Sequence, residues 1–313
     1  MNRWSYVLLR VLQVIPTFFV VMVLVFVVAR LLPGDPLTAI LGERATEDMV
    51  VRAKHELGLD KPVPVQFLIF LKDFFQGNLG DSINLKVPVS RLILERIPVT
   101  LFLTLYAAVL AALMAVPLAF VAALRKDTWA DHLIRGVFQL GLSMPVFYIG
   151  LQLLTLLGAR LRLFPVGGYG NNFGEHVYYL FLPALTLGFN LAAILMRNLR
   201  ASILEVLQAE YVDFARAKGL RPGLILGKHV LRNALISTVT LFGLNIGGLI
   251  GGAIITETVF AIPGVGRLMV DSIFGRDYPV IQGLTLAFAL LVSLVFILTD
   301  IIHAQLDPRV EAA

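Results

Sequence analysis

The chain has 313 residues, of which 58% are hydrophobic and 15% are charged, and its formal net charge is +5. Soluble globular chains carry about 25% charged residues, so the composition argues against a soluble fold. The chain has no cysteine, which excludes disulfides and thiolate metal sites.

Long charge-free intervals predict the transmembrane helices. A helix needs about 20 mostly apolar residues to cross the hydrocarbon core of a bilayer. Six intervals without Asp, Glu, Lys or Arg approach or exceed that length: 11–29, 97–124, 136–159, 176–196, 233–256 and 278–299. Six buried helices of a soluble bundle would need amphipathic helices to cover them, and the remaining chain is too short for that. We therefore predict an all-α membrane protein with six transmembrane helices in one domain, 1–313.

The basic residues predict that both termini lie in the cytoplasm. With that orientation, the cytoplasmic segments carry Arg3, Arg10, Arg125, Lys126, Arg135, Arg197, Arg200, Arg216, Lys218, Arg221, Lys228, Arg232 and Arg309. The short outer loops carry Arg160, Arg162, Arg267 and Arg276. An excess of Lys and Arg in cytoplasmic loops is the usual bias of membrane proteins.

The first interval reads as an uncleaved anchor helix, because its apolar stretch is longer than a signal-peptide core and Arg30 stands where a small residue would be cleaved. A long outer loop, 32–96, follows. It has turn residues at 33–36 and 77–81, and an apolar run at 63–71 that is too short to span. We expect this run to form a short helix with Phe74 and Phe75, inside a small extracytoplasmic module that faces a partner.

Within the second and third spans, Pro117 and Pro145 predict kinks, and neighbouring groups would satisfy the freed carbonyls. Tyr148 and Gln152 are candidates to line a path through the membrane. Asn190, in the fourth span, is a polar residue at membrane depth and a candidate to face a pore.

The inner loop, 197–232, is the most informative segment. Helix formers dominate up to Lys218, Gly219 is a natural C-terminal stop, and Pro222-Gly223 reinforces the break. A second helical stretch leads into the fifth span, so the loop reads as helix, sharp turn, helix. Its first helix has a small, moderately apolar face, formed by Ala209, Tyr211, Val212 and Ala215 with Arg216 and Lys218 beside it. Such a helix either lies on the membrane surface or docks a cytoplasmic partner, and the pattern alone leaves both open.

The fifth span carries glycines at every fourth position, Gly243, Gly247 and Gly251. Small residues at this spacing let helices approach closely in lipid. We expect packing within the subunit, or against a partner at a pore, with Asn245 as a pore candidate.

Several strings resemble ABC importer permeases of the dipeptide, oligopeptide and nickel class, of the dipeptide-permease B type. The segment 213–219, Asp-Phe-Ala-x-x-x-Gly, resembles the EAA loop, which docks into a cleft of the ATPase subunit in that family. Seven further strings occur in the family's order around the spans: 32–36, 56–62, 77–82, 96–101, 143–147, 257–268 and 276–279.

The resemblance implies a type I importer permease fold in the bacterial inner membrane. It implies three kinds of protein partner: a second permease, two cytoplasmic ATPases and a periplasmic binding protein, with no nucleic acid. ATP and magnesium would be bound by the ATPases, since the string 223–229 has neither the glycine spacing nor the Ser or Thr of a phosphate loop. The chain itself would not be an enzyme. The contact with the ATPase would be made by Tyr211, Asp213, Ala215, Arg216, Lys218 and Gly219, with Ala215 as the close-approach residue and Gly219 as the turn.

Other functions stay open on the sequence. The family also transports glutathione, nickel chelates and opines. A secondary transporter would usually place ionisable residues within its spans, and an intramembrane hydrolase would need a nucleophile beside a base. We find neither pattern, because the histidines fall in loops or at the ends of spans.

Overall fold

The computed structural model describes residues 3–31 and 60–306. The described residues are helical, apart from turns and one isolated antiparallel bridge between Asp81 and Pro88. The elements are α1 (Arg3–Leu31), α4 (Val63–Phe75), α5 (Val89–Leu124), α6 (Trp129–Ser143), α7 (Val146–Leu153), the π-helical η1 (Leu154–Arg160), α8 (Phe173–Leu207), α9 (Glu210–Ala217), α10 (Pro222–Leu224), the π-helical η2 (Ile225–Leu231), α11 (Arg232–Val259), α12 (Val265–Phe274) and α13 (Tyr278–Leu306). The predicted all-α class is confirmed.

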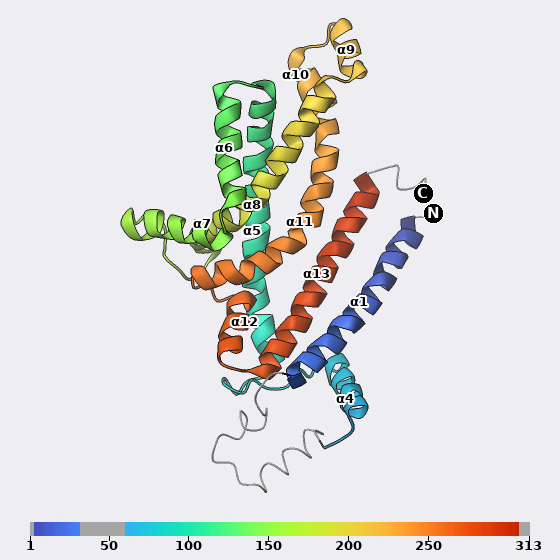
Figure 1. Ribbon diagram of the computed structural model, residues 1–313, viewed down its shortest axis with the longest axis vertical. Helices are drawn as coiled ribbons and strands as arrows, with labels where there is room; N and C mark the ends of the chain where they lie inside the picture. The colour runs from blue at the N-terminus through green and yellow to red at the C-terminus, as the bar shows by residue number, and fades with distance from the viewer. Residues whose placement is uncertain (1–2, 32–59, 307–313) are drawn as a thin grey trace.

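Helices α5 and α8 form the centre of the bundle (Figure 1). Small residues allow them to approach closely: Ala107, Ala111, Ala115 and Ala119 recur at every fourth position of α5 and have no exposed surface. A Cβ added at Gly188 of α8 would lie 2.5 Å from the carbonyl oxygen of Ala107. Such close contact between small residues is how helices associate in lipid.

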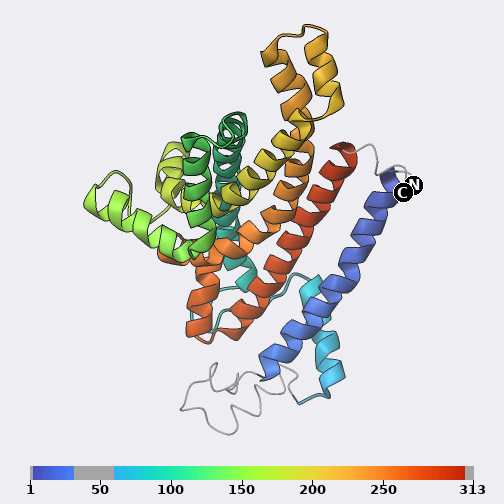
Figure 2. The same ribbon diagram turned by 45° about the horizontal axis from the view of Figure 1, so that its top comes forward.

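The remaining helices pack around this centre. Helix α6 covers one side of α8, α11 the other, and α12 lies across the end of the bundle beside α13. Helices α1 and α13 run side by side at the edge of the molecule in both Figure 1 and Figure 2. Figure 1 shows α9 at one end of the molecule and α4 and α12 towards the other. The beginning of α1 and the end of α13 lie near the middle of its length and point towards the side of α9, and the predicted N-in, C-in topology stays a prediction.

Four described helices are long and apolar enough to cross a membrane: α5, α8, the continuous stretch Pro222–Val259 and Tyr278–Thr299 of α13. The pair formed by α6 and Val146–Arg160 makes a fifth if it is one broken span. Helix α1 has a shorter apolar stretch than these four helices, Leu12–Val28. The chain is thus a multi-pass membrane protein, and the count of six spans stays a prediction.

The third predicted span is not a kinked helix. Helix α6 ends at Ser143, and the next helical segment leaves it at an angle of 111°. Proline has no N–H and its ring crowds the preceding turn, so Pro145 becomes the N-cap of α7 instead of a position within one helix. Helix α5, in contrast, continues through Pro117.

The helices extend beyond several charge-free intervals. Helix α5 already begins at Val89, and α8 continues to Leu207, so parts of the predicted loops 32–96 and 197–232 belong to long helices. The short helix expected in the outer loop is confirmed as α4, whose Phe74 and Phe67 rings lie 5.5 and 5.0 Å from Phe18 and Phe26 of α1. The turn at 33–36 and most of the string 56–62 lie outside the described residues.

Candidate functional site

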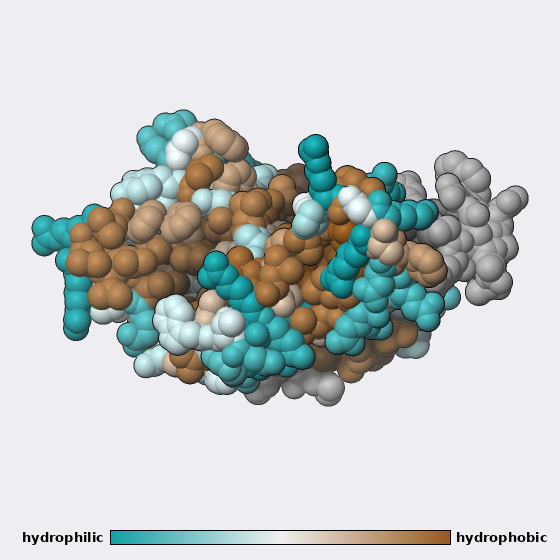
Figure 3. Space-filling view, turned by 90° about the horizontal axis from the view of Figure 1, so that it is seen from above, coloured by the Kyte–Doolittle hydropathy of each residue, from teal (hydrophilic) through white to brown (hydrophobic). Residues whose placement is uncertain are grey.

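Helix α9 is the part of the chain that extends furthest at its end of the molecule (Figure 1). It follows α8 after the short turn 208–209, and residues 218–221 then return the chain to α10. Seen from this end, hydrophilic side chains gather where α9 and α10 lie, whereas hydrophobic surface covers the arm formed by α7 (Figure 3). The exposed tip of α9 is therefore a surface in water.

Gly219 ends α9, as the sequence predicted. The Leu220 N–H donates to the Ala215 carbonyl at 3.3 Å, and the Gly219 N–H donates to the Arg216 carbonyl at 2.9 Å. These two bonds form a Schellman motif, which needs a left-handed residue at its turn. Gly219 has φ +71°, a backbone conformation that residues with a side chain rarely adopt. The predicted role of this glycine as the turn is confirmed.

One face of α9 is buried in the chain's own core. Val212 has no exposed surface and Ala215 is 6% exposed, and both belong to the core cluster that includes Ile225 and Val230 of η2. The sequence predicted Ala215 as the close-approach residue for a partner. The structure corrects this placement, because the Ala215 methyl group packs inward and supports the helix from behind.

Two aromatic side chains of α9 are exposed at its tip. Phe214 is 67% exposed, on the side of the helix away from Val212, and Tyr211 is 43% exposed, next to Ala215 on the helix surface. Asp213 accepts a hydrogen bond from Arg216 at 3.0 Å, and this ion pair is exposed on the same segment. Phe214 was not among the predicted contact residues, although an aromatic residue between Asp213 and Arg216 was the available signal.

Two connections join α9 to the fifth span. The Asn233 side-chain amide donates to the Tyr211 hydroxyl at 3.0 Å and to the His229 carbonyl at 2.8 Å. In addition, α10, η2 and α11 form one continuous helical stretch, Pro222–Val259. The predicted second helical stretch is confirmed, and it also contains the string 223–229, whose glycine spacing does not match a phosphate loop.

The glycines of the fifth span do not share one environment. Gly243 is buried and its carbonyl accepts a hydrogen bond from Thr299 of α13 at 3.4 Å. A Cβ added at Gly247 would lie 3.1 Å from the Phe296 ring of α13. Gly243 and Gly247 thus pack within the subunit, which was one of the two alternatives predicted for these glycines. Around Gly251, in contrast, an added Cβ would have no neighbour within 4 Å.

A second stripe of α11 is exposed and lacks a partner in the described part of the chain. It contains Gly248 and Gly251, where an added Cβ meets nothing within 4 Å, and Leu244 and Ile255, which are 55% and 48% exposed. Asn245, the pore candidate, is half-buried and donates to the Leu241 carbonyl of its own helix at 2.8 Å. This stripe is a surface on which another helix can pack closely.

Other pore candidates are scattered. Asn190 of α8 is half-buried, and Tyr148 and Gln152 are exposed on the arm formed by α7. The structure does not bring these residues together with Asn245 into one site, so their role in a path stays a prediction.

The glutamate in the outer string 257–268 caps a helix. Glu257 is fully buried and accepts hydrogen bonds from the Thr100 hydroxyl at 2.5 Å and from the Arg267 N–H at 3.0 Å. The Thr100 hydroxyl oxygen in turn accepts from the Val265 N–H at 3.0 Å. A carboxylate at the beginning of α12 accepts hydrogen bonds from N–H groups that have no acceptor within the helix. A Cβ at Gly264 would lie 2.3 Å from this carboxyl group, which explains the glycine.

A second buried carboxylate joins two other strings. Asp277 is 2% exposed and accepts from the Ser82 hydroxyl at 2.5 Å and from the Ile83 and Asn84 N–H groups at 3.1 Å each. It thereby fixes the segment after α4 to the turn between α12 and α13. Both strings were recognised as family motifs, but the sequence does not indicate that Asp277 of one accepts a hydrogen bond from Ser82 of the other.

Two family models together match most of the chain. Residues 115–312 match the binding-protein-dependent transport system inner membrane component family. Residues 3–104 match the family of the N-terminal part of binding-protein-dependent transport system membrane components.

Similar proteins cover the same length as this chain. It is 41% identical over 306 residues to the glutathione transport system permease protein GsiC of Pectobacterium atrosepticum, covering 98% of both chains. It is 39% identical over 330 residues to the di/tripeptide transport system permease protein DppB of Pseudomonas aeruginosa, again covering 98% of both.

Solved structures share the fold at low identity. An inward-facing form of the MetNI methionine ABC transporter matches with a TM-score of 0.59 and 16% identity, covering 69% of this chain and 96% of that chain. An amino acid ABC transporter crystallised with histidines matches with a TM-score of 0.54 and 16% identity, covering 69% and 94%.

Proposed function

The chain belongs to the family of binding-protein-dependent transport system inner membrane components, and from this premise we propose that it is a permease subunit of an ATP-driven importer of peptides. The observation that carries the substrate class is identity of 39–41% over 98% of the chain to permeases named for glutathione and for di- and tripeptides. Glutathione is itself a small peptide, so both names support a short peptide as cargo.

The proposed source of energy is ATP, hydrolysed by separate subunits that also hold the magnesium ion. The exposed face of α9 supports this proposal, because Phe214 and Tyr211 leave apolar surface at a tip in water that a partner would cover. The ion pair of Asp213 with Arg216 and the cation of Lys218 border that surface and would orient the docked subunit. The role of Arg216, Lys218 and Asp213 at the contact is part of this proposal.

The other proposed partners follow the same logic. A second, homologous permease would pack on the exposed glycine stripe of α11, since Gly248 and Gly251 allow close approach. A binding protein would deliver cargo at the opposite end, where Asp277 and Glu257 hold α12 and the adjoining segments in place. The assembly would lie in the inner membrane of a bacterium, with the two ATPases on its cytoplasmic side.

Alternating access is the proposed mechanism. Closure of the ATPases on ATP would move α9, and the stretch Pro222–Val259 would carry the displacement into the membrane. The exposed stripe of α11 would then change its contact with the second permease and open the path to the other side. In this proposal, ATP binding and hydrolysis act on this chain through the contact with α9.

The decisive experiment isolates the chain from its native membrane and asks what comes with it. Co-isolation of ATP-hydrolysing subunits is expected. Proteoliposomes of the isolated complex with its binding protein should then accumulate labelled dipeptides only when ATP is present on the side of α9. Unlabelled glutathione as a competitor decides between the two named cargoes. Uptake that follows an imposed ion gradient without ATP would instead identify a secondary transporter and overturn the proposal.

A further inference from the structure

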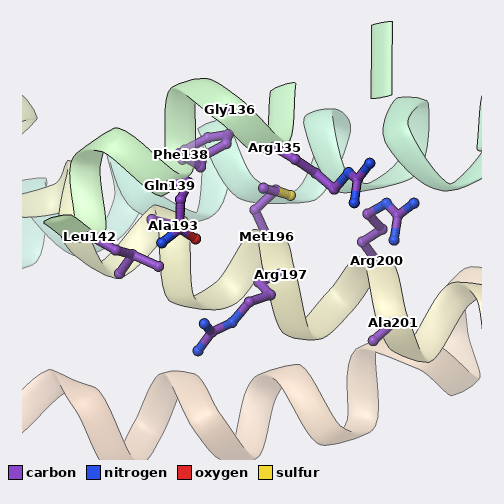
Figure 4. Close-up of a pocket in the computed structure, with 10 residues that line it drawn as sticks. All are labelled: Arg135, Gly136, Phe138, Gln139, Leu142, Ala193, Met196, Arg197, Arg200 and Ala201. Carbon is purple, nitrogen blue, oxygen red and sulfur yellow. The ribbon is translucent and has the colours of Figure 1, made fainter. Parts of the chain in front are cut away.

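A half-open pocket of about 460 Å³ lies between α6 and α8, towards the end of the molecule where α9 lies. In Figure 4 the guanidinium groups of Arg135 and Arg200 lie close together, whereas that of Arg197 points away from them. The lining therefore combines three cations with apolar side chains, among them Phe138 and Met196.

The pocket carries excess positive charge. Asp131 of α6 is fully buried and accepts from Arg200 at 2.8 and 2.6 Å, in a bidentate pair. The same carboxylate lies 3.2 Å from Arg135. In the described part of the chain it is the one carboxylate that forms ion pairs with these arginines, so three cations face a single anion.

Two polar groups of the lining have no partner among residues 3–31 and 60–306. The guanidinium group of Arg197 is exposed and makes no hydrogen bond or ion pair there, and neither does the side-chain amide of Gln139. Arg135 and Arg200, by contrast, are held in place by Asp131. A fixed pair of cations beside a free guanidinium and a free amide is a donor set for a carboxylate, which accepts hydrogen bonds from such groups.

The depth of the pocket places it at the inner boundary of the membrane. The charge-free interval of the third span begins at Gly136, and that of the fourth ends at Met196, and both residues line the pocket. A ligand here would be leaving or entering the membrane on the side where ATP is used.

The pocket opens to water rather than to lipid. On a helix with 100° per residue, Arg135 and Gln139 lie on roughly the opposite side of α6 from Leu133, Val137 and Leu140. These three apolar residues are 48%, 44% and 58% exposed, and they form the surface that suits hydrocarbon. Polar side chains at membrane depth usually face the bundle interior or a water-filled cavity. The side of α6 with the pocket is thus the side of a path.

We propose that this pocket is an anion subsite at the inner mouth of the translocation path, where Arg197 and Gln139 receive the carboxylate of a transported peptide and the side chain next to that carboxylate packs against the apolar lining at Phe138. The proposal rests on the proposed function for the identity of the cargo, but the presence of an anion site is measurable without transport. The headgroup of an anionic phospholipid is the competing occupant, and the test below separates the two.

The absence of cysteine in the natural chain makes the site directly measurable. In the complete complex, Gln139→Cys is labelled with an anionic sulfonatoethyl and with a cationic trimethylammonium methanethiosulfonate, and the unmutated complex gives the background. We expect the anionic reagent to react faster by about tenfold relative to its rate on a free thiol, because like charges repel and opposite charges attract at this short range. Arg197→Ala in the same background should remove most of that preference, and Arg197→Lys should retain it.

Peptides then identify the occupant. Alanyl-phenylalanine at a concentration equal to its dissociation constant should slow labelling of the cysteine about twofold, whereas its C-terminal amide should not. Vesicles of phosphatidylethanolamine with and without phosphatidylglycerol form the lipid arm, and they should give equal labelling rates.

Three outcomes would overturn the inference. Equal rates for the two reagents would show that there is no anion site. Equal protection by the peptide and its amide would show that the carboxylate is not what binds, and protection by phosphatidylglycerol alone would assign the pocket to lipid. If the complex shows a reagent preference but no ATP-driven uptake of any peptide, the proposed function fails while the anion site stands.

Discussion

Replacing Gly219 tests how α9 is coupled to transport. An L-residue in the left-handed region costs about 1–2 kcal/mol, and β-branched residues are the least tolerated there. A Cβ at Gly219 meets no atom within 4 Å, so steric overlap adds nothing and backbone strain is the whole cost. Because 1.4 kcal/mol is a factor of ten, about 2 kcal/mol in Gly219→Val lowers the population of the native turn roughly 30-fold relative to its alternatives.

The assay is the number of peptides taken up per ATP hydrolysed in proteoliposomes of the complete complex. For Gly219→Val we expect this ratio to fall at least about tenfold while the chain still assembles. Gly219→Asn should stay close to the natural protein, because asparagine visits the left-handed region more readily than other residues. Gly223→Val is the matched control, since Gly223 is also open to its surroundings but has no positive φ. Normal coupling in Gly219→Val, or equal loss in Gly219→Asn, would refute the reasoning.

Three further perturbations test the other surfaces. Phe214→Ala should abolish co-isolation of the ATPases without lowering thermal stability, whereas Phe274→Ala, at the opposite end and 84% exposed, should leave co-isolation intact. Glu257→Ala leaves N–H groups of α12 without an acceptor and should cost about 1–3 kcal/mol of stability, visible as a lower melting temperature of the complex; an unchanged melting temperature would contradict the cap. Gly248→Leu should block association with the second permease in a pull-down while the chain itself stays folded, and Gly247→Leu, which meets Phe296, should destabilise the chain as well.

The sequence predicted those features that a local pattern determines. Charge-free intervals located the long helices, and the glycine at 219 located the end of α9, because a left-handed turn requires that residue almost regardless of context. The break before α7 was predicted only as a kink, because the effect of a proline on a helix depends on its tertiary context. Pro117 and Pro183 lie inside helices that continue, so a proline alone does not decide between a kink and a break.

At Pro145, tertiary packing decides that the helix breaks instead of continuing with a kink. Gly150 of α7 is in close contact with α8 and with the end of α11: an added Cβ would lie 3.1 Å from both Thr186 and Phe260. The break lets α7 lie against these partners, which a straight continuation of α6 would not allow. The pairing of Glu257 with Thr100, two residues that are 157 positions apart, was invisible for the same reason: no local pattern reports a tertiary contact.

The buried face of α9 bears on how force reaches the membrane. If α9 were joined to the fifth span only through the turn at 218–221, a push on its tip would be absorbed by rotation about that turn. Val212 and Ala215, however, pack against η2, and Tyr211 accepts a hydrogen bond from Asn233 at the beginning of α11. A displacement of α9 therefore has to move the first turns of the fifth span with it, because separating them would expose core residues. In this lateral contact the small residues of α9 face inward, while its aromatic residue at 214 is exposed and available for the proposed partner.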